Sequence, residues 1–229
     1  MPPAPTFDIP PYRLSGTVIG TLLNHPGALA ALGEAVHRPP YQAPPRAPVL
    51  YLKPRNTLLA PGEPPRLPAG VEAMVLGASL GIVIGRSACR VDERGAMDCV
   101  AGYTIVVDLH VPHADVYRPS VRFRARDASC AISGEVTPRA SVVDPDRLAV
   151  TVRIDGQVVQ RTGTAGMVRP VARLVADVSE FMTLGPGDVL LLGIAPDAPL
   201  LRAGQAASIE IESLGRLLLP AAVAEREAA

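Results

Sequence analysis

Side chains able to do chemistry gather in one short stretch near position 110. Two carboxylates and two imidazoles follow one another there, in the order Asp108, His110, His113 and Asp115. Imidazole nitrogens and carboxylate oxygens are common ligands of zinc and related ions, so the cluster could form a metal site. Pro112 interrupts any regular spacing, however, and histidine-rich loops are often no more than polar loops. The sequence favours the polar loop and leaves the metal site as an alternative.

Basic side chains form a second candidate group. Val121–Arg126 alternates apolar and basic residues, which is typical of a strand with one buried face. Arg122, Arg124 and Arg126 would then form a row able to bind a polycarboxylate through bidentate hydrogen bonds. A solvated strand face explains the same pattern and is favoured. Lys53 could contact an anionic ligand, or it could be a solvated lysine before a turn.

Apolar runs of strand length surround these residues. Ala78–Gly85 and Val100–Val107 are two such runs, and Asp108 follows the second directly. Leu148–Ile154 alternates apolar and polar residues, and Asp155-Gly156 after it is a typical type I′ hairpin turn. The shorter runs Val49–Leu52, Val189–Leu192 and Ser208–Ile211 are also expected to be strands. Cys99 and Cys130 are expected to be core residues.

Two segments have helical spacing. Pro170–Met182 places its apolar residues on one stripe, with a proline suited to a first helical turn. Pro26 could begin a shorter helix that includes Leu29, Leu32 and Val36. Leu184–Asp188 has the proline and glycine of a type II turn. Many short strands with one or two short helices predict a mainly β fold of the α+β kind.

Bulk composition excludes several classes of protein. The 229 residues contain 22 Lys and Arg against 22 Asp and Glu, and this zero net charge argues against a nucleic-acid partner. The apolar runs are too short to span a membrane. The three cysteines form no C-x-x-C pair, and the first residues do not resemble a signal peptide. We therefore expect a cytoplasmic protein with reduced cysteines.

Several motifs together resemble the fumarylacetoacetate hydrolase family. A family pattern, Glu-x-Glu-Leu-x-x-x-Ile-Gly followed by Gly-Tyr-x-x-x-x-Asp, is matched at Leu80, Ile84, Gly85, Gly102, Tyr103 and Asp108. Further similar segments are Lys53–Thr57, the run Asp155, Gly156, Gln160, Thr164 and Met167, and the Leu184–Asp188 turn. The resemblance covers roughly residues 49–219. It implies a mixed β-sandwich or roll, divided here into an arm with a strand and short helix at 1–48 and a β domain at 49–229.

The resemblance also implies what the site should contain and what it has lost. In the family, two glutamates and the aspartate bind a divalent metal, but here the glutamate positions are Gly77 and Ser79, and only Asp108 remains. A single carboxylate is a poor site for Mg²⁺. Arg124 stands in place of a family lysine. His110 and Pro112 replace a serine and an arginine, and Leu192-Gly193-Ile194 replaces Thr-Gly-Thr. We therefore expect no metal bound by this chain.

Finer details resemble one branch of the family, the isomerase/decarboxylases of homoprotocatechuate (4-hydroxyphenylacetate) degradation. These details are Tyr117-Arg118-Pro119, Arg126-Asp127 and Cys130. Some members of the branch are tandem chains whose first half lacks the glutamates, as this chain does. The resemblance implies a metal-free subunit in a homo-oligomer or a hetero-oligomer. In the second case a sibling chain would hold Mg²⁺ or Mn²⁺.

The expected ligand is a small polycarboxylate substrate, in a reaction that passes through an enolate. The substrate-binding residues implied by the resemblance are Lys53, Asp108, Arg124, Gln160 and Thr164. Catalytic roles stay unassigned, with Asp108, Arg124 and Lys53 as the candidates. Two alternatives stay open. One is a non-catalytic subunit that binds a dicarboxylate or buttresses its partner, and the other is a stand-alone hydrolase or lyase with an atypical site.

Overall fold

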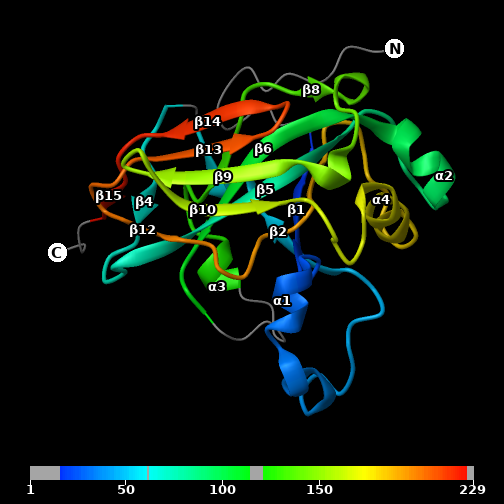
Figure 1. Cartoon of the computed structure of the whole chain (residues 1–229), viewed down its shortest axis with the longest axis horizontal. Helices are drawn as coiled ribbons and strands as arrows, with labels where there is room; N and C mark the ends of the chain where they lie inside the picture. The colour runs from blue at the N-terminus through cyan, green and yellow to red at the C-terminus, as the bar shows by residue number, and fades with distance from the viewer. Residues whose placement is uncertain (1–15, 61, 114–120, 226–229) are drawn as a thin grey trace.

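The computed structural model describes residues 16–60, 62–113 and 121–225 (Figure 1), so Asp115 and Tyr117-Arg118-Pro119 lie outside the described residues. The strands are β1 Val18–Leu22, β2 Val49–Lys53, β3 Leu58–Leu59, β4 Arg66–Leu67, β5 Ala73–Ile84, β6 Val100–His110, β7 Cys130–Ile132, β8 Thr137–Pro138, β9 Ala149–Ile154, β10 Gln157–Gly163, β11 Val189–Leu191, β12 Leu200–Arg202, β13 Ala207–Ile211, β14 Gly215–Leu219 and β15 Val223–Ala224. The α-helices are α1 Pro26–Ala30, α2 Glu93–Ala96, α3 Val121–Arg124 and α4 Val171–Ser179.

A nine-stranded mixed sheet is the centre of the molecule. Its main path runs β2-β1-β11-β5-β6-β7-β3, with β12 added to β5 and β8 added to β6. β2 ends at Lys53 on one edge of this path, and β3 begins at Leu58 on the opposite edge. Since so few residues join the two edges, the sheet must curl until they nearly meet. The curl gives the sheet an inner and an outer face.

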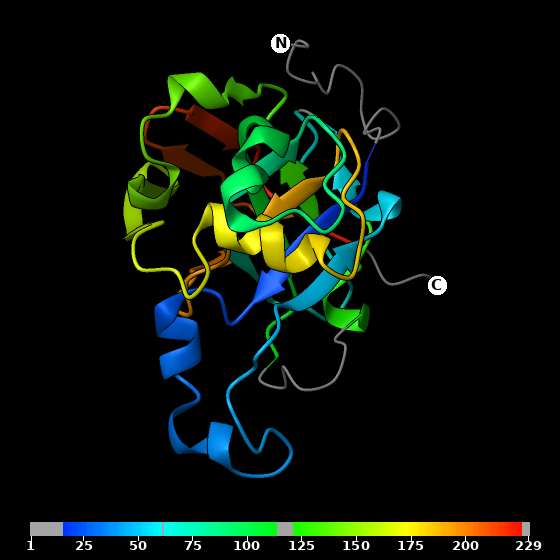
Figure 2. The same ribbon diagram turned by 90° about the vertical axis from the view of Figure 1, so that its right-hand side faces the viewer.

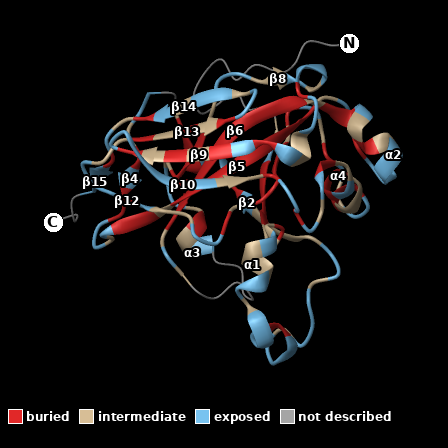
Figure 3. Ribbon diagram, in the orientation of Figure 1, coloured by how far each residue is buried: buried red, intermediate tan, exposed pale blue. Residues whose placement is uncertain are grey.

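Strands β5 and β6 divide their side chains between these faces. Leu80 and Ile82 on β5 and Ile105 on β6 belong to the larger apolar core on the outer face. The alternate residues Val83 and Val106 belong to a second apolar cluster inside the curl. Both strands are buried along nearly their whole length (Figure 3). The two predicted strands are confirmed, and each is longer than predicted because both faces are covered.

A four-stranded antiparallel sheet packs on the outer face. Its order is β10-β9-β13-β14, and Val150, Val152 and Ile209 join the larger core (Figure 1). The predicted hairpin is confirmed, since Asp155 and Gly156 have φ of +49° and +80°, as a type I′ turn requires. The predicted class, a mainly β sandwich or roll with few helices, is confirmed.

The two predicted helices had different outcomes. α4 is confirmed, and it buries Leu174, Val175 and Val178 at one end of the sheets, beside α2 (Figure 2). The helix predicted to begin at Pro26 does begin there, but it does not continue to Val36 as predicted. α1 ends at Ala30, and a separate 3₁₀ turn begins at Gly33, whose φ of +47° interrupts the helix. In the described ranges, no helix is long and apolar enough to cross a membrane.

The predicted strand at Val121–Arg126 is also wrong. Val121–Arg124 is the short helix α3, in which residues two apart point in nearly opposite directions. Arg124 is therefore buried while Arg122 is exposed, and Arg126 after the helix is exposed as well. The row of three arginines on one strand face, whether solvated or able to bind a polycarboxylate, does not exist. Six alternating residues were too few to distinguish a strand from one helical turn.

Candidate functional site

Asp108 is the centre of a buried polar cluster inside the curled sheet. Its Oδ1 accepts a hydrogen bond from Lys53 Nζ at 2.8 Å. Its Oδ2 accepts one from Arg124 Nη1 at 2.7 Å and another from the Tyr51 hydroxyl. The side chains of Asp108 and Lys53 are fully buried, and the Arg124 side chain is 8% exposed. Both carboxylate oxygens are thus occupied by donors from the protein itself.

The β2 strand brings Tyr51 and Lys53 to the same place. The two residues are two apart on a strand, so their side chains project from the same face. Gly20 on β1 pairs with Tyr51 across the strands, and a Cβ atom at Gly20 would lie only 2.0 Å from the tyrosine ring. A glycine is required at position 20, because the ring lies across its backbone.

The Lys53 ammonium has a full set of acceptors. Besides Asp108, it donates to Ser129 Oγ at 2.9 Å and to the backbone oxygens of Arg124 and Ser129 at 2.5 and 3.2 Å. Burying a charged lysine is tolerated only when its donors are satisfied in this way. Lys53 therefore ties three segments together, β2, β6 and the stretch that follows α3.

The protonation states in the cluster follow from burial and charge. Burial alone would raise the pKa of Asp108, but the charges of Lys53 and Arg124 outweigh it, and the pKa lies below its ordinary value. Burial, followed by the charge of Asp108, raises the pKa of Tyr51 well above its usual range. Asp108 is therefore ionised and Tyr51 is neutral near pH 7.

His110 lies on the same face of β6 and is neutral as well. Burial, helped by the Arg124 charge, lowers its pKa to about 4. Its Nε2 lies 3.4 Å from Arg124 Nη2, and since arginine has no acceptor, Nε2 must be the unprotonated nitrogen. The proton is then on Nδ1, which lies 3.6 Å from Asp108 Oδ2. With two cations and one anion, the cluster carries an excess of one positive charge.

The residues present do not make a site for a divalent cation. Gly77, at a family glutamate position, pairs directly with Asp108, but a Cβ atom there would lie 2.7 Å from Ile194 Cδ1. The Ser79 hydroxyl accepts a hydrogen bond from Gly193 N at 3.2 Å. Asp108 already bonds to two cationic side chains, which repel a metal ion. The space and charge that a metal ion would need are taken by Ile194, Lys53 and Arg124.

The histidine cluster does not gather as a ligand set either. The rings of His110 and His113 meet edge to face with centroids 5.4 Å apart, and His113 stacks on Phe123. Among the residues that the structure describes, no group of three or more His, Cys, Asp or Glu side chains could hold a metal ion. Asp115 lies outside them.

Gln160 and Thr164, the other two predicted site residues, make their contacts away from Asp108. Gln160 Nε2 donates to Asp197 Oδ1 at 3.0 Å. Thr164 Oγ1 donates to the Pro145 oxygen at 2.7 Å and accepts from Leu148 N at 2.8 Å, so both contacts hold a loop in place. The structure brings Lys53, Asp108 and Arg124 together and gives these two residues other partners.

Tyr51 and Ser129 belong to the cluster but were not among the predicted site residues. Tyr51 could have been found if the predicted strand Val49–Leu52 had been extended by one residue to Lys53, because residues two apart on a strand share a face. No signal in the sequence indicated Ser129. Cys99 and Cys130 are buried, as predicted, and burial raises the pKa of the Cys130 thiol to about 12, which makes it unreactive.

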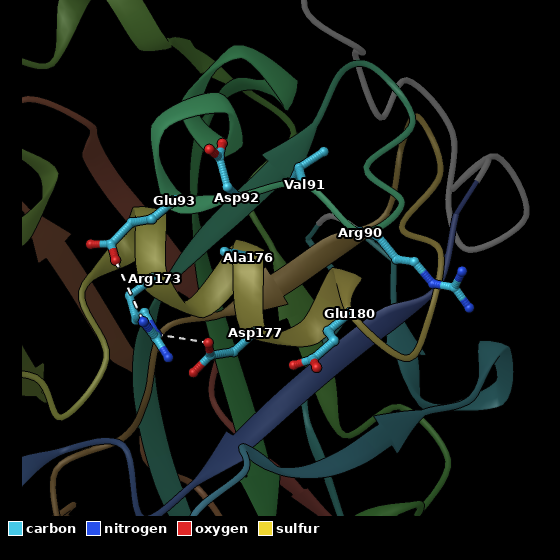
Figure 4. Close-up of a pocket in the computed structure, with 8 residues that line it drawn as sticks. All are labelled: Arg90, Val91, Asp92, Glu93, Arg173, Ala176, Asp177 and Glu180. Carbon is cyan, nitrogen blue, oxygen red and sulfur yellow. Dashed lines mark ion pairs between the residues drawn. The ribbon is translucent and has the colours of Figure 1, made fainter.

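A surface hollow of about 630 Å³ lies elsewhere, between α2 and α4 (Figure 4). Three of its charged side chains pair there: Arg173 contacts Glu93 at 3.8 Å and Asp177 at 2.7 Å. The residues that line it are Arg90, Val91, Asp92, Glu93, Arg173, Ala176, Asp177 and Glu180. It is a surface hollow beside these ion pairs, so Asp108 and its neighbours remain the candidate site.

A curled mixed sheet packed on an antiparallel sheet, with an acid inside the curl, defines the fumarylacetoacetate-hydrolase class of folds. A 5-carboxymethyl-2-hydroxymuconate delta-isomerase from Mycobacterium smegmatis has this fold, with a TM-score of 0.77 and 28% identity over 93% of this chain and 81% of its own. Residues 17–219 match the family Fumarylacetoacetate (FAA) hydrolase C-terminal. The chain belongs to this family.

A curated relative is more similar in sequence, and a second solved structure shares the fold. A 4-hydroxyphenylacetate degradation bifunctional isomerase/decarboxylase from Salmonella dublin is 37% identical over 214 residues, which are 93% of this chain and 48% of that protein. The chain thus spans about half the length of this curated relative. A fumarylpyruvate hydrolase from Pseudomonas aeruginosa, in complex with Mn²⁺ and pyruvate, has a TM-score of 0.72 at 22% identity, over 91% of this chain and 89% of its own. That similarity shows the fold alone.

Proposed function

We propose that this chain is a metal-free subunit of a 4-hydroxyphenylacetate-degradation isomerase/decarboxylase. Its reactions would be the decarboxylation of 5-oxopent-3-ene-1,2,5-tricarboxylate and the isomerisation of 2-hydroxyhepta-2,4-diene-1,7-dioate. Support comes from the 37% identity to a bifunctional enzyme of that name and from a structural neighbour that is an isomerase of a related polycarboxylate. The substrate class is a small polycarboxylate with an enol or 2-oxo group.

One observation carries the metal-free part of the proposal. Both oxygens of Asp108 accept hydrogen bonds from Lys53, Arg124 and Tyr51, and the partner position Gly77 has no side chain. A divalent metal stabilises an enolate by chelating the substrate's carboxylate and neighbouring oxygen. That chemistry would come from a sibling chain with the Glu-x-Glu motif, while this chain contributes contacts to the substrate or to its partner.

The test is reconstitution with a family member from the same genome that retains both glutamates. We expect the isolated chain to show no decarboxylation or isomerisation above background, and the two chains to co-elute as one complex with activity. The matched control is the sibling with its glutamates replaced by glutamine, which should leave the mixture inactive. Steady turnover by this chain alone, abolished by EDTA and by His110→Ala, would instead establish a stand-alone enzyme.

Assembly is part of the same proposal. The sequence has two apolar runs that a lone domain would struggle to cover, Val189–Leu192 and Leu217–Leu219. In the structure, Val189–Leu192 is wholly buried within this chain. Leu218 on β14, in the second run, is 65% exposed and therefore remains an apolar side chain that a partner subunit could cover. We expect a dimer or a larger assembly by light scattering, weakened by Leu218→Glu. The three free cysteines accord with a cytoplasmic protein.

A further inference from the structure

The guanidinium of Arg124 uses only part of its hydrogen-bonding capacity. Nη1 donates to Asp108, and Nη2 lies 3.4 Å from His110 Nε2. Nε is buried and has no acceptor. In an arginine side chain, Nε–H and one Nη2–H point the same way along one edge of the planar group, which is the edge that binds a carboxylate with two parallel hydrogen bonds.

The surroundings of this edge favour an anion. Lys53 and Arg124 share the single charge of Asp108. In the part of the chain that the structure describes, no second carboxylate lies within 4 Å of either cation. Buried donors without acceptors are rare, and buried excess charge is costly, so a ligand that supplies one carboxylate would relieve both.

The guanidinium is also held in a fixed orientation. Its central carbon lies 4.5 Å from the centre of the Tyr51 ring, so the ring covers one face of the guanidinium. Asp108 fixes one edge through Nη1. A side chain held at two points loses little freedom when it binds a ligand, which improves affinity.

We propose that the Nε–H and Nη2–H edge of Arg124 binds one carboxylate of a small 2-oxo acid, without a metal ion. The class of ligand rests on the proposed function, whereas the unused edge rests on the contacts of Arg124 alone. The ligand carboxylate would accept two parallel hydrogen bonds and neutralise the excess charge of the cluster. Arg124 is thus a carboxylate-binding residue at a position where the family has a lysine.

The test is a titration of the isolated, EDTA-treated chain with pyruvate, the smallest 2-oxo acid. Proton–nitrogen NMR follows the arginine Nε–H signals, since a buried Nε–H exchanges slowly with water. We expect one protected Nε–H signal to move on titration, with a Kd on the order of 1 mM. Methyl pyruvate, which has no free carboxylate, should leave the signal unmoved.

Two variants complete the experiment. Arg124→Lys keeps the charge but loses the two-pronged edge, so pyruvate should bind at least about tenfold more weakly by calorimetry. Arg126→Lys, an exposed residue two positions away, should bind as the unmodified chain does. The proposal is overturned if pyruvate moves no protected Nε–H signal in the unmodified chain, a result that does not depend on Arg124→Lys folding. Binding that appears only after Mn²⁺ is added would overturn it too. Neither readout needs the sibling chain, so failure here is distinct from failure of reconstitution.

Discussion

The Lys53 ammonium lies 2.8 Å from the Asp108 carboxylate, and both side chains are wholly shielded from solvent. Buried charges with so little access to water are stable only when an opposite charge lies beside them. The Lys53 ammonium and the Arg124 guanidinium compensate the negative charge of this carboxylate, which a metal ion would otherwise compensate. The site therefore retains the family's aspartate but uses it for internal charge pairing.

Breaking this pair should be costly. Lys53→Met leaves Ser129 and one oxygen of Asp108 without their donor, and removing one partner of a buried pair costs about 3–5 kcal/mol of unfolding free energy. The exposed pair Arg147–Asp144, 3.6 Å apart, offers a matched control. Arg147→Met should change stability by less than about 1 kcal/mol. Urea unfolding of both variants measures the difference, and equal losses would contradict the prediction.

Stability should fall between about pH 6.5 and pH 4 because of His110. Its pKa is 6.5 in the unfolded chain and about 4 in the folded one, so the unfolded state binds more protons in that window. Unfolding free energy then rises with pH there, and the group accounts for a difference on the order of 3 kcal/mol. The lowered pKa of Asp108 affects stability at lower pH. Its contribution to the unfolding free energy is lost only as the pH falls below the ordinary pKa of a carboxyl group.

Urea unfolding at several pH values tests the histidine contribution. His110→Gln should flatten the dependence between pH 4 and pH 6.5, whatever it does to stability at pH 7. His37→Gln, at an exposed position, should leave the slope as it is. A slope that stays unchanged in His110→Gln would assign the pH dependence to other groups.

Ile194 and Gly77 should be energetically coupled. A Cβ atom at Gly77 would lie 2.7 Å from Ile194 Cδ1 and 2.9 Å from the Asp108 backbone oxygen, so Gly77→Ala should destabilise the chain. Ile194→Ala removes the first clash but leaves the second. A double-mutant cycle should therefore show partial relief, with a coupling energy of at least about 0.5 kcal/mol. Strictly additive losses would show that Ile194 does not fill this space.

Much of the fold was predictable because its longest elements have strong patterns. β5 and β6 each contain a long apolar run, and α4 has a clear apolar stripe, so their positions followed from these patterns. The turn at Asp155-Gly156 followed from residues that tolerate positive φ. The short segments failed, since α3 is a single turn whose conformation depends on tertiary contacts. Arg124 is oriented by Asp108, which lies 16 residues away.

The candidate site was predictable only in part. The family pattern identified Asp108 and the two lost glutamate positions, Gly77 and Ser79, whereas the direct pairing of Gly77 with Asp108 came from the structure. Lys53 reaches Asp108 only because the sheet curls until its two edges nearly meet, and a long-range closure of that kind leaves no local pattern. The role of Tyr51 depends in turn on Gly20, across two paired strands. Contacts of this kind come from topology and cannot be read from spacing along the chain.

Thermal melting with and without Mn²⁺ tests the central claim, that side-chain cations replace a divalent metal at Asp108. The EDTA-treated chain is melted in 0 and about 5 mM Mn²⁺, a hundred times a Kd of about 50 μM, with a glutamate-containing family member as the positive control. A competent site would gain about 2.7 kcal/mol at that concentration, or roughly 5–10 °C in Tm for a chain of this size. We predict such a shift in the control and a shift of less than about 1 °C in this chain. A reproducible rise of several degrees in this chain would contradict the account and would assign metal-dependent chemistry to it.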